Sequence, residues 1–139
     1  MGALDRYNRE AGTITIAQYG TAGIVAWQEQ RFWANDVCYS ILPDNTLLNN
    51  KFLYHLLANK QEYIYSRVNR ATYPPTLARK ELLEIECPLP PLALQQQIVD
   101  ILDKFYTLIH ALEEELRAEQ TLRRTQYLYY CNLLLNFPK

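Results

Sequence analysis

Side chains able to hold a nucleic acid are concentrated in two stretches of the sequence. The first surrounds a pair of glycines and continues beyond them, with Tyr19, Gly20, Thr21, Gly23, Trp27, Gln28, Arg31, Trp33 and Asn35. The second follows Tyr63 and Tyr65 into a proline-rich loop, with Arg67, Asn69, Arg70, Thr72 and Tyr73. Both combine rings that stack on bases with donors that reach phosphates and base edges. We therefore predict that these residues contact DNA.

The competing interpretation is structural: the aromatic rings belong to the core, and the charged groups simply face water. Composition alone leaves both interpretations open. Up to Lys80 the chain has nine basic and six acidic residues, whereas from Glu81 onward it has five basic and nine acidic residues. A mildly basic first part followed by an acidic last part is compatible with DNA binding by the first part.

The residue types needed for catalysis form no recognisable pattern. The Gly-Thr-Ala-Gly run at residues 20–23 lacks the Gly-Lys-Ser/Thr ending of a phosphate-binding loop. Asn35-Asp36 lacks the flanking pattern of an amino-methyltransferase site, and we interpret His55 and His110 as structural. The three cysteines are too far apart for a zinc motif and are expected to be free, buried thiols. We expect no enzyme activity, no cofactor and no metal.

Hydrophobic patterning predicts the elements that would position the two polar stretches. Strands are expected where β-branched and apolar residues dominate or alternate with polar ones, at residues 13–17, 24–27, 36–42 and 84–87. The first two would form a hairpin across the glycines. One helix is expected from an N-cap at Asn49 or Asn50 to Ser66, and a short helical turn at residues 79–83. The predicted fold class is α+β, with a small mixed strand and helix body over residues 1–92.

The last third of the chain predicts one long helix, from Leu94 to Phe137, within a second domain at residues 93–139. Apolar residues recur along it at steps of three and four, as in a coiled coil. We expect this face, together with tyrosines near the helix end, to form a dimer contact through Ile98, Ile101, Leu102, Phe105, Leu108, Leu112, Leu116, Tyr127 and Tyr130. No apolar run reaches 18 residues, so we expect no membrane span and a cytoplasmic location.

The entry into this helix carries a more specific signal. Residues 88–105 read Pro-Leu-Pro-Pro-Leu-x-x-Gln-x-x-Ile-Val-x-Ile-Leu-Asp-x-Phe. This string resembles the junction between a target-recognition domain and the conserved helix in specificity subunits of Type I restriction-modification systems. The segments at residues 20–23 and 32–37 and the helix after Asn50 are similar to the second half of such a recognition domain. One departure is Ala78, where the family often has a small polar helix cap, so that cap is either missing or supplied by Thr76.

The resemblance implies a non-catalytic subunit that reads double-stranded DNA and recruits separate methyltransferase and restriction subunits. Family members have two recognition domains and two conserved helices packed antiparallel, so this chain looks like a truncated or half-length form. It implies a homodimer through the long helix, in which the helices fix the gap between two half-sites. The alternative is a helical dimerisation protein with no DNA specificity of its own.

Overall fold

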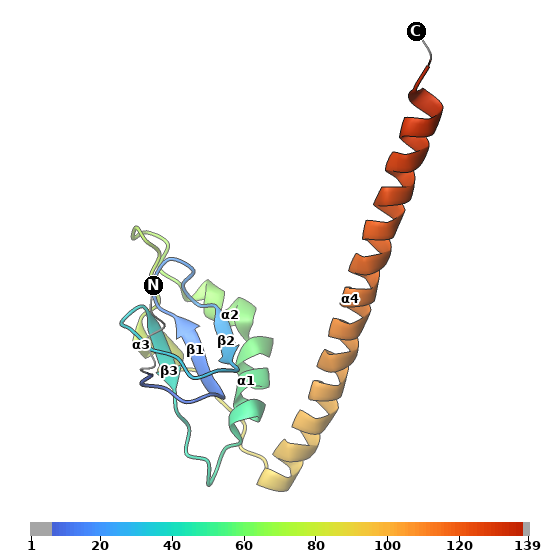
Figure 1. The fold of residues 1–139 in the computed structure, drawn as a ribbon. Helices are drawn as coiled ribbons and strands as arrows, with labels where there is room; N and C mark the ends of the chain where they lie inside the picture. Colours follow the sequence, from blue (N-terminus) through green and yellow to red (C-terminus); the bar gives the residue numbers. More distant parts are fainter. Residues whose placement is uncertain (1–6, 138–139) are drawn as a thin grey trace. The chain divides into compact units, whose positions relative to one another are not determined.

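The computed structural model describes residues 7–137, so the outermost ends of the predicted domains 1–92 and 93–139 lie outside the described residues. The chain divides into two compact units, Met1–Val99 and Asp100–Lys139. The first unit, called the body below, contains the sheet, three short helices and the first two turns of the long helix α4. The second unit consists of the remainder of α4 (Figure 1).

A three-stranded antiparallel sheet forms one layer of the body. Its strands are β1 (Thr13–Ala17), β2 (Val25–Gln28) and β3 (Cys38–Ile41), in the order β2-β1-β3. The predicted hairpin is confirmed, because β1 pairs with β2 in the register Ile14 to Trp27. The third strand is shorter than predicted, since residues 36 and 37 form a turn before it. The central strand is the most deeply buried of the three.

The single helix predicted up to Ser66 is divided into α1 (Asn50–Asn59) and α2 (Gln61–Ser66). Of the two predicted caps, Asn49 is the one that caps α1, and its side chain accepts hydrogen bonds from the backbone of two following residues. Lys60 separates the helices because its backbone (φ −90°, ψ 14°) lies in the bridge region rather than the helical one. The break lets both helices face the sheet.

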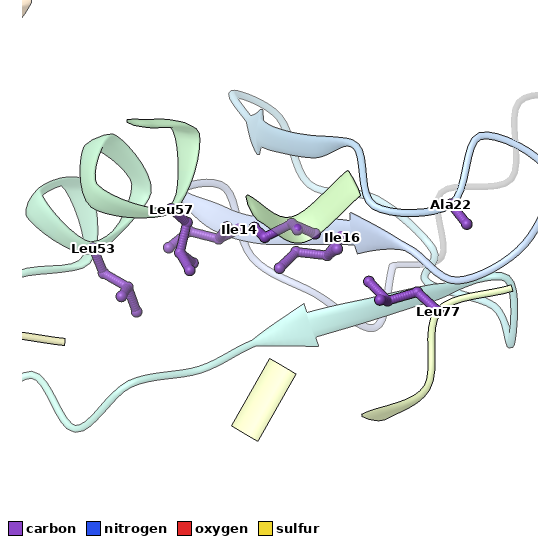
Figure 2. Packing of buried hydrophobic residues seen from close by; sticks show 7 residues of the cluster. Ile14, Ile16, Ala22, Leu53, Leu57 and Leu77 are labelled. Atoms are coloured by element: carbon purple, nitrogen blue, oxygen red, sulfur yellow. The ribbon is translucent and has the colours of Figure 1, made fainter. Parts of the chain in front are cut away.

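The core lies between the sheet and these helices, as Figure 2 shows. Seven residues form its centre: Ile14, Ile16, Ala22, Leu53, Leu57, Ile64 and Leu77. The two isoleucines of β1 are at most 1% exposed, and Ile64 of α2 and Leu77 are each 1% exposed. Burying each such side chain contributes about 1.5–3 kcal/mol, which makes this cluster the main stabilising feature of a small body.

The segment after α2 differs from its prediction at one point. The helical turn is confirmed as α3 (Arg79–Leu83), and its N-cap Ala78 makes no side-chain hydrogen bond, so the polar cap is missing. The prediction of a strand at residues 84–87 is wrong, because this segment pairs with neither edge of the sheet. Ile85 and Cys87 instead pack against the core. This contact explains why apolar residues alternate here although, among the described residues, the segment forms no backbone hydrogen bonds to a strand.

The long helix is confirmed as α4 (Leu92–Leu135), a single helix of 44 residues. Its first turns are tied to the body through Gln95, which is 0% exposed. The Gln95 amide nitrogen donates to the carbonyls of Leu47 (3.0 Å) and Pro90 (2.8 Å), and its oxygen accepts from the Asn49 backbone (2.7 Å). A buried amide with three partners fixes this junction.

The three cysteines are free, as predicted, but each is only partly buried, so the prediction of buried thiols was wrong. Burial raises the pKa of the Cys87 thiol, and the nearby charge of Lys60 partly opposes this. None of the helices in the described part of the chain is long and apolar enough to cross a membrane.

Candidate nucleic-acid interface

The fold brings the two polar stretches together at one point. Tyr19, just before the glycine turn, forms an isolated β-bridge with Thr76 of the proline-rich loop, and Thr76 also bridges Asn69. The backbone N–H of Gly20 donates to the carbonyl of Pro75 at 3.2 Å. Residues more than fifty positions apart in the sequence therefore form one continuous surface, which we call the loop junction (residues 19–21 and 69–76).

The loop junction presents exposed aromatic and polar groups. The Tyr73 ring is fully exposed and Tyr19 is 43% exposed, while Arg70 also lies on the surface. The loop is braced from inside, because the Asn69 side chain accepts from the Ala71 backbone at 2.9 Å and the Thr72 hydroxyl donates to the Asn69 carbonyl at 3.2 Å. A braced loop with exposed rings and an exposed cation can contact bases and phosphates with little loss of conformational entropy.

Arg67 lies at the edge of this surface and is held by its neighbours. Its guanidinium donates to the Tyr63 hydroxyl at 2.8 Å, stacks 5.0 Å from the centre of that ring, and lies 3.5 Å from the Glu81 carboxylate. The hydrogen bond to Tyr63 is the main cause that raises the Arg67 pKa. Arg67 therefore reaches an anion only by leaving or sharing these partners.

Three residues of the first predicted group take part in packing. Gly23 is buried with φ +89°, and a Cβ there would lie 3.1 Å from Val68, so a glycine is required for close approach to the end of α2. The Trp27 ring packs 5.6 Å from that of Tyr54, under the Lys51 ammonium. The Gln28 amide donates to the Thr15 hydroxyl at 2.8 Å. For these three residues, the observed contacts support a packing role rather than a place on a binding surface.

The remaining three residues of that group lie on the segment between β2 and β3. Arg31 pairs with Glu10 at 2.8 Å and covers the Tyr7 ring at 4.6 Å. Trp33 is 62% exposed, and Asn35 accepts a long hydrogen bond from the Val37 backbone at 3.4 Å. These residues are accessible, but the bridges that form the loop junction do not include them.

Sequence reasoning missed Gln18, which lies beside the loop junction and whose amide donates to the Tyr19 hydroxyl at 3.1 Å. Its only sequence signal was proximity to the predicted Tyr19. Thr76 ends the loop predicted to face DNA, and its hydroxyl lies 3.2 Å from that of Thr72. His55 and His110 contact neighbouring tyrosine rings, and the described residues include no group of acidic, histidine and cysteine side chains arranged to hold a metal.

The helix unit, taken by itself, exposes the predicted apolar residues. Phe105, Leu108, Leu112 and Leu116 are each 58–59% exposed, and Tyr127 is 68% exposed. Ile98 belongs to the body and is partly buried there. A helix with large apolar side chains exposed along most of its length is typical of an element that packs against a partner.

Comparison with known proteins places this geometry in a family. The Type I restriction modification DNA specificity domain matches residues 1–120. The Type I restriction enzyme MpnII specificity subunit of Mycoplasma pneumoniae is 35% identical over 89% of this chain and 37% of that protein. The EcoR124I/EcoR124II specificity subunit of Escherichia coli is 35% identical over 72% of this chain and 25% of that protein.

A solved structure agrees with these relatives. The crystal structure of a Type I restriction-modification system S subunit from M. genitalium superposes with a TM-score of 0.69 and 25% identity, covering 89% of this chain and 33% of that one. The chain thus spans between a quarter and about a third of the length of these relatives. On the family match and the shared fold, the chain belongs to the family of Type I restriction modification DNA specificity domains.

Proposed function

We propose that this protein is a DNA sequence-recognition subunit of a Type I restriction-modification system. The observation that carries the proposal is the loop junction, which joins two distant polar and aromatic segments into one exposed surface on a body of the specificity-domain family. Relatives named as specificity subunits support the same assignment.

The proposed DNA contact uses the exposed members of the loop junction, with Tyr19, Gly20, Thr21, Asn69, Arg70, Thr72 and Tyr73 at its centre and Arg31, Trp33, Asn35 and Arg67 as flanking contacts. Arg70 would contact a phosphate or a guanine edge, and Tyr73 would stack or wedge against a base or sugar. Gly23, Trp27 and Gln28 support this surface through packing and are not assigned a direct contact.

A second part of the proposal concerns α4. We assign Ile101, Leu102, Phe105, Leu108, Leu112, Leu116, Tyr127 and Tyr130 to an antiparallel pairing with α4 of a second copy, because these side chains are exposed in the helix unit. Burying six large apolar side chains would contribute about 9–18 kcal/mol for each helix before the cost of association. The resulting two-fold particle would read a two-part, inverted-repeat target.

The chemistry is assigned to other subunits. A methyltransferase and, in the full complex, a restriction subunit would act on the DNA that this chain selects, while the chain itself neither methylates nor cleaves. A cytoplasmic location follows from these partners. Co-purification of the chain with a methyltransferase subunit tests this assignment without any DNA.

Duplex binding at increasing salt tests the DNA contact. We expect an affinity that falls with salt, because phosphate contacts release counterions. Arg70→Ala should weaken binding by about 1–3 kcal/mol, for one target sequence if the side chain reads a base and for all sequences if it contacts phosphate. Arg117→Ala removes the same charge from α4, which is not part of the proposed DNA contact, and should have little effect. Unchanged affinity in the triple variant Arg67→Ala, Arg70→Ala and Tyr73→Ala would remove this loop from the contact.

Association of α4 is tested separately, by sedimentation. Phe105→Asp with Leu112→Asp should convert the dimer to a monomer at tens of micromolar protein. Thr107→Asp with Thr125→Asp adds the same charges on the opposite side of the helix by periodicity and should leave the dimer intact. A monomeric wild type, or an unchanged dimer in the first variant, would contradict the pairing.

A further inference from the structure

Along one edge of the body's sheet, the described residues place no neighbouring strand. The Ala17 N–H donates to Ile24 and its carbonyl accepts from Gly23, so Ala17 faces β2, whereas the Gln18 N–H donates to Val37 on the β3 side. Because strand residues alternate in direction, Ile14 and Ile16 face β3 and pair with Ile41 and Tyr39. The backbone groups of Cys38 and Ser40 therefore face away from β1, along an edge at which the described part of the chain places no further strand.

A groove of about 750 Å³ is lined by all four residues of β3. Its other lining segments are Gln18 after β1, Leu42, parts of α3, and residues 8–9 and 34–36. Figure 1 shows β3 on the side of the sheet opposite β2. An open groove along a strand edge is the geometry in which an added strand forms main-chain hydrogen bonds.

The residues that line the groove include polar, apolar and charged side chains. Among the described residues, the buried Ser40 hydroxyl oxygen and Arg9 Nε atom have no hydrogen-bond partner. Leu42 and Leu83 are 68% and 74% exposed. Two arginines, Arg9 and Arg79, line the groove against a single acidic residue, Asp36. These features favour a strand with one acidic side chain and apolar side chains toward Leu42 and Leu83.

We propose that the β3 groove binds one extended strand from a further part of a specificity-subunit polypeptide that this sequence does not contain. The relatives contain much polypeptide outside the matched region, since this chain covers only 37% of the MpnII subunit and 33% of the M. genitalium S subunit. Strand addition at β3 would extend the three-stranded sheet and pair the backbone groups of Cys38 and Ser40 that face away from β1. This inference rests on family membership and is independent of DNA binding.

Synthetic peptides of about ten residues, the upper length of a typical strand, provide the probe. They are tiled across the part of the MpnII specificity subunit that this chain does not match. Binding to the full chain is followed by NMR-detected amide exchange. In the chain alone, the Cys38 and Ser40 amides should exchange fast and the Tyr39 and Ile41 amides slowly. A bound strand should slow Cys38 and Ser40 as well.

Ser40→Pro gives the discriminating variant, because it removes an N–H that faces the groove while leaving the hydrogen bonds to β1 in place. It should weaken peptide binding by roughly three- to tenfold, which is the loss of about one hydrogen bond. Ser40→Ala keeps the N–H and should retain most of the affinity. Slow exchange at Tyr39 and Ile41 in both variants shows that the sheet is intact.

Three results would overturn the proposal. One is that no tiled peptide binds, and another is that a peptide binds without slowing the Cys38 and Ser40 amides. The third is protection of these amides that rises with protein concentration in the absence of peptide, which would mean that a second copy occupies the edge.

Discussion

Replacement of Gln95 by leucine tests the junction between the body and the first turns of α4. The variant keeps the side-chain volume but removes three hydrogen bonds, leaving the Asn49 N–H and the carbonyls of Leu47 and Pro90 without their partner. Each unsatisfied buried group costs about 1–3 kcal/mol. Leu47 is itself exposed, so water can reach part of this site, and the leucine regains some apolar burial. We expect a net loss of about 2–4 kcal/mol, a large part of the stability of a small domain.

Urea unfolding followed by tryptophan fluorescence measures this loss. Both tryptophans, Trp27 and Trp33, lie in the body, so the signal reports the unit that contains Gln95. Gln97→Leu is the matched control, because Gln97 is exposed on the same helix and should change stability by only about 0.5 kcal/mol. Equal unfolding midpoints for the two variants would show that the Gln95 hydrogen bonds do not stabilise the junction.

Three further predictions concern the turn, the core and the chemistry. Gly23→Ala should destabilise the body by about 1–3 kcal/mol, because Gly23 has a φ of +89° and an added Cβ would contact Val68. Gly20→Ala should cost only about 1 kcal/mol, because Gly20 has a φ of +70° but open space around it. Equal thermal unfolding midpoints for the two variants would refute this difference. Tyr39→Phe should cost about 1 kcal/mol in urea unfolding, because the hydroxyl donates to the Leu77 carbonyl at 2.9 Å; no change would mean that water replaces the bond. The purified chain should transfer no labelled methyl group to DNA, and any transfer by the chain alone would contradict its proposed non-catalytic role.

The local elements could largely be predicted from the sequence because their signals are local. The alternation of apolar and polar residues predicted β1, and a capping asparagine at position 49 or 50 predicted the start of α1. Apolar residues at steps of three and four predicted α4. The strand at residues 84–87 was wrong because alternation records which side chains face the core but not whether a neighbouring strand is present to pair. The sequence motif at residues 88–105 specified a glutamine at position 95, but its buried role was not predicted, because only tertiary contacts show which backbone groups its amide binds.

The candidate interface shows the same limit. Residue types identified both polar stretches, but the bridge from Tyr19 to Thr76 is a long-range contact that no local pattern encodes. Conversely, Gly23 and Trp27 have the residue types of a binding surface and are used for packing. Which side chains contact DNA stays a prediction, now centred on the loop junction.

Selection of bound sequences from a random duplex pool tests DNA sequence recognition by this chain. The experiment uses the wild-type chain, alone and with a co-purified methyltransferase subunit, and repeats the selection with the Arg70→Ala variant. For the wild type we expect enrichment of an inverted repeat whose halves are separated by a constant gap. For the variant we expect relaxed preference at one position if Arg70 reads a base, or uniformly weaker recovery if it contacts phosphate. Recovery of a pool without any enriched sequence, with and without the methyltransferase, would contradict a role in DNA sequence recognition.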